Sequence, residues 1–174
     1  RSASRFVGET AFSLCIIMMK RRKPLSSPEA LSRLTALCNA SEQCSSDLFR
    51  KLASWGISQT DTAGIMAHLT STRLLDDRRF AGAYARDKMR YSLWGRLKIR
   101  AGLYAKRVSR DDIDDALASL DADEYAEAAT RAVMSAAARH ERPLTYESKM
   151  KILRHCVARG FEPSVIVPLV RHLD

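Results

Sequence analysis

The amino-acid sequence predicts an all-α protein built from three tandem three-helix repeats. Only seven glycines and five prolines occur in 174 residues, which is too few for the many turns of an all-β fold. Apolar residues recur at helical spacing from Ser27 onward. The same helical unit then returns twice, at intervals of roughly 50 residues, which is typical of an array of stacked repeats.

The first copy opens with two helices whose ends are marked in the sequence. We expect the first over residues 28–40, because Ser27-Pro28-Glu29 supplies a capping hydroxyl, a proline at the first helical position and an acid near the positive end of the helix dipole. The second is expected to start at Ser45 or Ser46. It should end at Gly56, since glycine readily adopts the left-handed conformation that closes a helix.

A third expected helix completes the unit, and its start also recurs along the chain. Ser58 can cap an amide of the first turn while Asp61 reaches back to it. This pair returns as Ser109…Asp112, and Glu162-Pro163 opens the last helix. Shifts of 51 and of a further 53 positions superimpose the apolar residues of the three copies. The matched sets are Leu48, Ile99 and Ile152; Leu52, Leu103 and Cys156; Ile57, Val108 and Phe161; and Leu69, Leu120 and Leu173.

Helices expected over residues 77–90 and 123–140 precede the second and third copies of this unit, which gives nine helices in all. The alternative is a single irregular helical bundle with chance periodicity. Because the caps and turn residues repeat together with the apolar positions, the sequence favours an elongated array of repeats.

These boundaries divide the chain into four parts. Residues 1–26 form an N-terminal basic arm, and the repeats occupy residues 27–75, 76–120 and 121–174. We expect the arm to be partly non-native or disordered, with native translation starting at Met18 or Met19.

The arm contains an apolar run over residues 11–19, followed by the basic cluster Lys20–Lys23. Nine residues are too few to cross a bilayer, and a secretory signal carries its positive charge before the apolar stretch. We therefore expect a cytoplasmic protein with no membrane association. Its four cysteines form no C-x-x-C pair and should be reduced thiols. The basic cluster either contacts phosphates or is a solvated charge run.

Charge is segregated along the array. The chain has a formal net charge of +9. Residues 76–110 hold eleven basic and three acidic side chains, whereas residues 111–130 hold eight acids and no lysine or arginine. Carboxylates near helix starts, such as Asp112 and Asp123, are explained by capping and by the helix dipole. The excess of positive charge in the middle repeat favours a polyanionic partner.

The basic side chains of the middle repeat are the candidate contacts with that partner. Arg79, Arg86 and Arg90 fall on one face of the helix expected over residues 77–90. The full set is Arg78, Arg79, Arg86, Lys88, Arg90, Arg96, Lys98, Arg100, Lys106 and Arg107. Such side chains neutralise phosphates or pair with acidic loops, although many basic residues merely cover solvated helix faces. Arg79 is also a candidate for an ion pair within the chain.

Aromatic side chains lie among these charges, and aromatic rings can stack on bases. They are Tyr84, Tyr91, Trp94 and Tyr104. The competing interpretation is core packing, because Phe80, Tyr84 and Tyr104 lie on faces that we expect to be buried.

The sequence carries none of the common catalytic or cofactor motifs. Neither G-x-x-x-x-G-K-[ST], G-x-G-x-x-G, H-E-x-x-H nor G-x-S-x-G occurs, and no calcium-loop pattern is present. His155 and Cys156 are adjacent and diverge on a helix, so they do not form a metal site together. Cys156 occupies a position filled by leucine in the other copies, which predicts a core residue. We therefore expect a non-enzymatic binding protein without metal or cofactor.

Three segments of the middle repeat form a recognisable pattern. They are Leu74-Leu75-Asp76-Asp77-Arg78-Arg79-Phe80-Ala81, then Trp94-Gly95-Arg96-Leu97-Lys98-Ile99-Arg100, and then Ile113…Ala116-Leu117. In these residues the middle repeat resembles the RecX family, the regulators of the RecA recombinase. The first copy is also similar, and the third fits more loosely. Gly102 departs from the family's pattern, and a glycine within a helix lowers helix stability by about 1 kcal/mol relative to alanine.

The resemblance implies a curved, all-helical regulator in DNA repair, homologous recombination and the SOS response. Such a protein binds along the RecA–single-stranded DNA filament as a monomer and restrains ATP hydrolysis and strand exchange, with no catalytic residues. Two alternatives remain. A direct nucleic-acid-binding helical protein would bind DNA without RecA and lose affinity steeply with salt. A scaffold for an acidic protein would bind neither.

Overall fold

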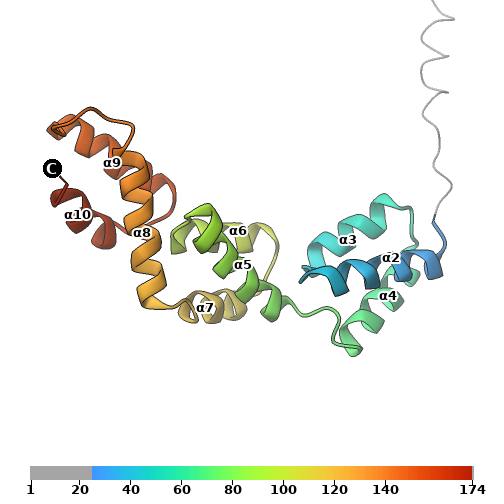
Figure 1. Cartoon of the computed structure of the whole chain (residues 1–174). Coiled ribbons are helices and arrows are strands. Elements are labelled where there is room, and N and C mark those ends of the chain that lie inside the picture. The colour runs from blue at the N-terminus through green and yellow to red at the C-terminus, as the bar shows by residue number, and fades with distance from the viewer. Residues whose placement is uncertain (1–24, 174) are drawn as a thin grey trace, which may run out of the picture.

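The computed structural model describes residues 25–173. The apolar run, the basic cluster and the possible start methionines of the expected arm lie outside the described residues. Within residues 25–173 the secondary structure is entirely helical (Figure 1). The nine helices are α2 (Ser27–Ala40), α3 (Ser45–Ser54), α4 (Gln59–Ser71), α5 (Asp77–Ser92), α6 (Arg96–Ala105), α7 (Arg110–Ala118), α8 (Ala122–Ala137), α9 (Tyr146–Ala158) and α10 (Pro163–Arg171).

The helices fall into three successive groups of three, α2–α4, α5–α7 and α8–α10, which form an elongated and curved array (Figure 1). Helices pack mainly within their own group, and α5 also packs against α8 of the next group. The predicted all-α fold of tandem three-helix repeats is confirmed. None of the helices in the described part of the chain is both long and apolar enough to cross a membrane.

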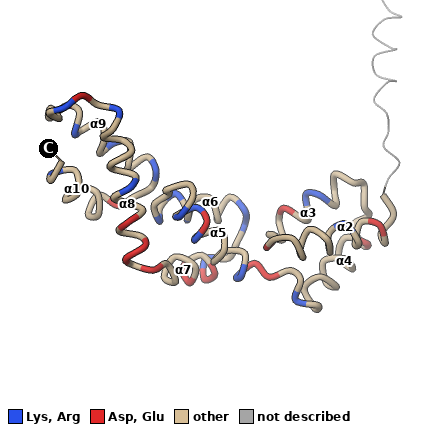
Figure 2. The backbone as a smooth tube through the Cα atoms, in the orientation of Figure 1, with Lys and Arg blue, Asp and Glu red and all other residues tan. Residues whose placement is uncertain are grey.

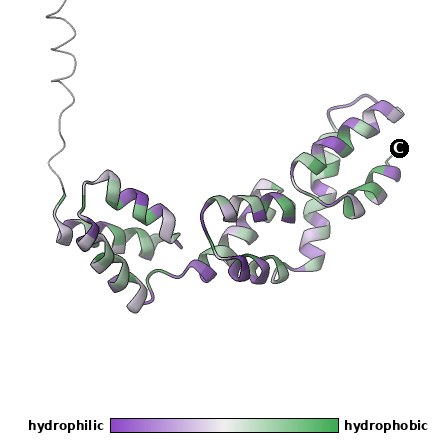
Figure 3. Ribbon diagram, turned by 180° about the vertical axis from the view of Figure 1, so that it is seen from behind, coloured by the Kyte–Doolittle hydropathy of each residue, from purple (hydrophilic) through white to green (hydrophobic). Residues whose placement is uncertain are grey.

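The equivalent positions of the three repeats form their cores. The first two matched sets, headed by Leu48 and Leu52, are fully buried in all three copies, and Cys156 is a core residue as predicted. The third and fourth sets are also buried, except that Ile57 is half-buried. In Figure 3 hydrophobic and hydrophilic residues are interspersed along the helices, as expected of helices that each bury one face.

The helix starts follow the predicted chemistry with one correction. The Ser58 and Ser109 hydroxyls accept hydrogen bonds from the amides of Asp61 and Asp112, as expected. The predicted cap at Ser27 is wrong, because the capping residue of α2 is Ser26. A capping box needs an acid three residues after the cap, and Glu29 meets this spacing from Ser26.

Four helix ends differ from the predicted ones, including the start of α8, which is Ala122 rather than residue 123. Helix α2 includes Ser27, and α5 continues to Ser92, where Leu93 adopts a left-handed conformation with φ 49°. Helix α8 ends at Ala137 rather than at residue 140. Gly56 and Gly160, by contrast, close their helices with φ of 75° and 86°, as the repeat predicts.

The buried residues of the described chain form two separate hydrophobic cores. The first is formed by α2–α4, and the second extends without interruption through α5–α10. Among residues 25–173, Cys44, at the start of α3, is the one residue of the first repeat that belongs to the second core. The first repeat is therefore packed as one body, and the second and third repeats as another.

Candidate functional site

The ten candidate basic residues lie on α5, on α6 and at the C-terminal end of α6. Figure 2 shows positive charge over these helices and negative charge along α7 and the first half of α8. The two kinds of charge, separated in the sequence, meet in the folded chain because α5 packs against both α7 and α8.

Six of the ten candidates form ion pairs with carboxylates of the chain. The pairs are Arg78 with Asp115 at 3.0 Å, Arg79 with Glu42 at 2.9 Å, Arg90 with Glu124 at 2.8 Å, Arg96 with Glu162 at 3.6 Å, Arg100 with Asp114 at 2.5 Å and Lys106 with Asp47 at 2.6 Å. The expected intramolecular pair of Arg79 is thus confirmed. The sequence does not indicate the partner carboxylate in any of the six pairs.

The acidic stretch consequently has two roles. Asp121 caps α8 by accepting from the Glu124 amide, as expected of an acid at a helix start. Asp114, Asp115 and Glu124 instead neutralise arginines of α5 and α6. Hydrogen bonds to Glu124 and Asp114 raise the pKa values of Arg90 and Arg100 respectively, so both arginines are held in their charged form.

Four candidates have no carboxylate within ion-pair distance among residues 25–173. They are Arg86, Lys88, Lys98 and Arg107. The Lys88 and Lys98 ammonium groups lie 5.1 and 4.7 Å from the centre of the Trp94 ring. These four side chains offer positive charge to a partner without first giving up an internal ion pair.

The aromatic side chains of the middle repeat do not share one environment. Phe80 and Tyr84 are half-buried against the core, with ring centres 5.7 Å apart. The expectation that Tyr104 is buried is wrong, because this side chain is 47% exposed. It follows Leu103 on α6 and is therefore turned about 100° away from the buried row of Ile99 and Leu103.

The departure at Gly102 has a packing reason. A Cβ atom at this position would lie 2.4 Å from the Tyr84 hydroxyl oxygen, closer than real Cβ contacts allow. The Tyr84 ring therefore occupies the space that a side chain would fill on α6. Glycine lowers the stability of α6 at this position, but it allows Tyr84 of α5 to pack closely against α6.

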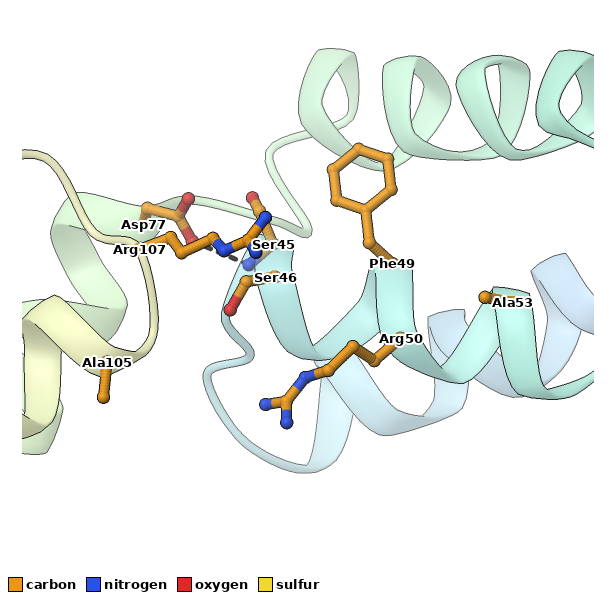
Figure 4. A pocket seen from close by; sticks show the side chains of 8 residues that line it. All are labelled: Ser45, Ser46, Phe49, Arg50, Ala53, Asp77, Ala105 and Arg107. Carbon is orange, nitrogen blue, oxygen red and sulfur yellow. Dashed lines mark hydrogen bonds between the residues drawn. The ribbon is translucent and has the colours of Figure 1, made fainter.

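The junction between the first and second repeats is largely polar. The Ser45 amide donates to Asp77 Oδ1 at 2.8 Å, Cys44 Sγ lies 3.2 Å from the Lys106 carbonyl oxygen, and Lys106 pairs with Asp47. A cavity of about 580 Å³ opens beside these contacts. Figure 4 shows Arg107 reaching from the second repeat toward Ser45 and Asp77 at one side of this cavity.

The junction between the second and third repeats is built on close backbone approach. The Gly95 amide donates to the Arg159 carbonyl at 2.9 Å, and the Leu97 amide donates to the Gly160 carbonyl at 3.0 Å. A Cβ at Gly95 would lie 2.1 Å from the Gly160 oxygen, so this contact requires glycine.

A buried tyrosine completes this second junction. The Tyr125 hydroxyl accepts from the Arg96 amide at 3.1 Å and donates to Glu162, while the Arg96 guanidinium covers its ring at 3.9 Å. Burial, and then the hydrogen bond to Glu162, raise the pKa of Tyr125 far above its usual value. The hydroxyl therefore stays protonated and holds the two repeats together.

Together these features define a class of protein: an elongated helical-repeat protein whose middle repeat carries an excess of positive charge over residues 76–110. Residues 76–117 match a family model described as RecX, second three-helix domain. Among the described residues, no three His, Cys, Asp or Glu side chains gather closely enough to hold a metal ion.

Curated proteins and solved structures agree with this match. The chain is 26% identical over 137 residues to "Regulatory protein RecX" of Limosilactobacillus reuteri (strain DSM 20016), covering 79% of the chain and 52% of that protein. It is 29% identical over 120 residues to "Regulatory protein RecX" of Enterococcus faecalis, covering 69% and 45%. The chain thus spans about half the length of the curated relatives it matches. None of their names describes a catalytic activity.

The fold is shared with two crystal structures. One is titled as regulatory protein RecX, with a TM-score of 0.74, 22% identity and coverage of 93% of this chain and 87% of that one. The other is RecX from Lactobacillus salivarius, with a TM-score of 0.72, 20% identity and coverage of 85% and 96%. The family model and the curated relatives support the RecX family for this chain, and the predicted resemblance is confirmed.

Proposed function

We propose that this chain is a non-enzymatic modulator of the RecA recombinase. It binds along the RecA–single-stranded DNA filament as a cytoplasmic monomer and restrains ATP hydrolysis and strand exchange. The RecA partnership is what the RecX family implies. The observation that carries the proposal is an elongated array of three-helix repeats in which four cations of the middle repeat have no carboxylate within ion-pair distance among residues 25–173.

An elongated array suits a polymeric partner. A helical filament repeats its surface, so successive repeats of this chain can contact successive subunits. Once one repeat is bound, the other repeats are held close to the filament at a high effective concentration. The overall affinity is therefore higher than that of any single contact. The division of the chain at residues 75/76 and 120/121 stays a prediction, and under the proposal each unit is a separate contact module.

The ten candidate basic residues remain the proposed contacts, but they differ in whether an internal ion pair must be broken before they bind a partner. The six ion-paired residues must exchange an internal carboxylate for one of the partner's anions, which returns little net free energy at an exposed site. Arg86, Lys88, Lys98 and Arg107 need no such exchange. We expect these four to contribute more to binding than the six.

The direct test is ATP hydrolysis by the cognate RecA on single-stranded DNA, titrated with this protein. The rate should fall as the protein saturates the filament. An unchanged rate at saturation would contradict the proposal.

A charge-reversal variant tests which surface acts. The combined change Arg86→Glu, Lys88→Glu and Lys98→Glu should abolish the effect while far-ultraviolet circular dichroism shows intact helicity. A matched control reverses Arg33, Lys51 and Arg171, which change the net charge equally outside the candidate surface. The control should modulate RecA like the unmodified protein.

The second candidate function is direct binding to nucleic acid without RecA. Cations that face no internal carboxylate favour it, because they are free to neutralise phosphates. Co-sedimentation with single-stranded DNA, with and without RecA, separates the two functions. Filament modulation predicts that sedimentation depends strongly on RecA, whereas direct binding predicts that it does not.

A further inference from the structure

A row of alternating lysines and aromatic rings runs from the first junction to the second. The Lys106 and Lys88 ammonium groups lie 6.0 and 5.4 Å from the Tyr84 ring centre. Lys88 and Lys98 lie 5.1 and 4.7 Å from the Trp94 ring centre. The order along the row is Lys106, Tyr84, Lys88, Trp94 and Lys98. Because Lys88 and Lys98 share one ring, their ammonium groups lie within about 10 Å of each other.

The third repeat adds further positive charge at the Trp94 end of this row. Arg159 donates to the Leu93 carbonyl at 3.0 Å and also to the Ser92 carbonyl, which fixes the segment that carries Trp94. The backbone of Gly160 packs directly on Lys98. Neither Arg139 nor Arg159 has a carboxylate within ion-pair distance in the described part of the chain.

We propose that Lys88 and Lys98, which flank Trp94, and Arg159, which is bonded to the segment that carries Trp94, form a phosphodiester-binding site for single-stranded nucleic acid. This group, the Trp94 cluster, is built jointly by the second and third repeats. The candidate residues of the middle repeat alone do not define it. The site would contact the DNA strand of the RecA filament, which makes the proposed function more specific. It rests on the proposed function in one respect: the expectation that the strand is single.

The alternation of lysines and aromatic rings favours a nucleic-acid strand as the ligand. A single small anion needs one compact set of donors, whereas a strand presents phosphates in series along a flexible backbone. Lysines separated by aromatic rings match such a series, since the cations neutralise phosphates and aromatic side chains offer faces to bases. The Trp94 ring is half-buried and already in contact with two ammonium groups, so its main role is to hold them apart at a fixed separation.

His155 reports the excess of positive charge in the cluster. Burial lowers its pKa, and the charges of Arg159, Arg139 and Lys98 lower it further. A bound phosphate would reverse the sign of the local field and raise the pKa of His155. Binding should therefore take up a proton, and affinity should increase as the pH falls from 7.5 to 6.0.

Binding of fluorescein-labelled oligodeoxythymidylate to the full chain, without RecA, tests the site. The double change Lys88→Gln and Lys98→Gln should weaken binding about ten-fold and lower the slope of log affinity against log salt concentration by about 1.4, since each phosphate contact on a single strand contributes about 0.7. The matched control is Arg33→Gln with Lys51→Gln, near Trp55 in the first repeat, where Arg33 lies 6.0 Å from the ring. The control should bind within two-fold of the unmodified protein.

Two further readouts locate the strand and detect the proton. Fluorescence of the Trp55→Phe protein, which keeps Trp94, should be quenched by the oligonucleotide, whereas that of the Trp94→Phe protein should not. His155→Gln should remove most of the affinity gain at low pH while circular dichroism stays unchanged.

Three outcomes would overturn the site. They are equal loss in the control double variant, quenching confined to Trp55, and polyglutamate competing as well as the oligonucleotide, which would indicate an acidic-peptide site. Because RecA is absent from these experiments, their failure leaves filament modulation standing, and a failure of modulation leaves this site standing.

Discussion

The two junctions of the array use opposite means to join similar repeats. At the first junction the two repeats have separate cores and are joined by ion pairs, as in Lys106 with Asp47 and Arg79 with Glu42. At the second junction a continuous core and the contact of Gly95 with Gly160 hold the repeats together. Ion pairs are also present there, but they add to an interface that is already packed.

Exposed ion pairs such as those at the first junction contribute little stability. Both junctions nevertheless keep cations that have no carboxylate within ion-pair distance among residues 25–173: Arg107 lies at the first junction and the Trp94 cluster at the second. The first repeat therefore has a core of its own, whereas the second and third repeats share one.

Core truncations should break the comparison most strongly. Leu52→Ala in the first core and Leu103→Ala in the second should each lower the free energy of unfolding of their own core by about 3 kcal/mol, because both side chains are fully buried. Urea titrations followed by Trp55 fluorescence, in a Trp94→Phe background, should show the effect of Leu52→Ala. Titrations followed by Trp94 fluorescence should show only that of Leu103→Ala. A single transition shifted equally by both changes would mean that the cores are coupled.

The glycine contact at the second junction is the next largest effect. Gly160→Ala should lower the free energy of unfolding by about 3 kcal/mol, because Gly160 has φ of 86° and a Cβ there would lie 2.3 Å from the Lys98 nitrogen. Gly64→Ala is the matched control, since no atom lies within 4 Å of its Cβ position on α4. That change should raise stability by about 1 kcal/mol. Equal behaviour of the two variants in thermal unfolding would remove the packing argument for this junction.

Fold and site differ in how far the sequence predicts them. The repeats, most caps and the buried rows are local patterns, and so the periodicity of Leu48, Ile99 and Ile152 was sufficient to predict them. The cap at Ser26 is harder to predict, because Ser27-Pro28 resembles a helix start and only the capping-box spacing to Glu29 favours Ser26.

The charged contacts could be predicted only in outline. Arg90 and Glu124 are 34 residues apart, and Arg159 lies 66 residues from the Leu93 carbonyl that it binds. Their proximity depends on how helices cross, which composition and periodicity do not define. The available signal was the acidic stretch directly after the basic one, which indicates that opposite charges could pair across neighbouring helices.

The smallest expected effect is the loss of stabilisation by the Asp47 ion pair of the first junction at low pH. Burial acts to raise the pKa of Asp47, but hydrogen bonds from Lys106 and Arg50 outweigh it and hold that pKa below its usual value. The stabilisation is therefore present above about pH 4 and is lost as the pH falls through the lowered pKa.

Asp47→Asn should accordingly cost about 1 kcal/mol at pH 7 and much less at pH 3. Small-angle X-ray scattering at pH 7 should show a broader range of shapes for this variant, with the unfolding transition of Trp94 unchanged. An Asp47→Asn protein with the same pH dependence as the unmodified protein would rule out this carboxylate as the titrating group.

Hydrogen–deuterium exchange of the protein alone and on the RecA–single-stranded DNA filament tests the central claim most directly, because it follows both junctions in one experiment. The account predicts that binding slows exchange chiefly in peptides covering residues 88–98 and 152–160, which form the second junction and the Trp94 cluster. Slowed exchange confined to residues 45–77 at the first junction, with the second junction unchanged, would contradict it.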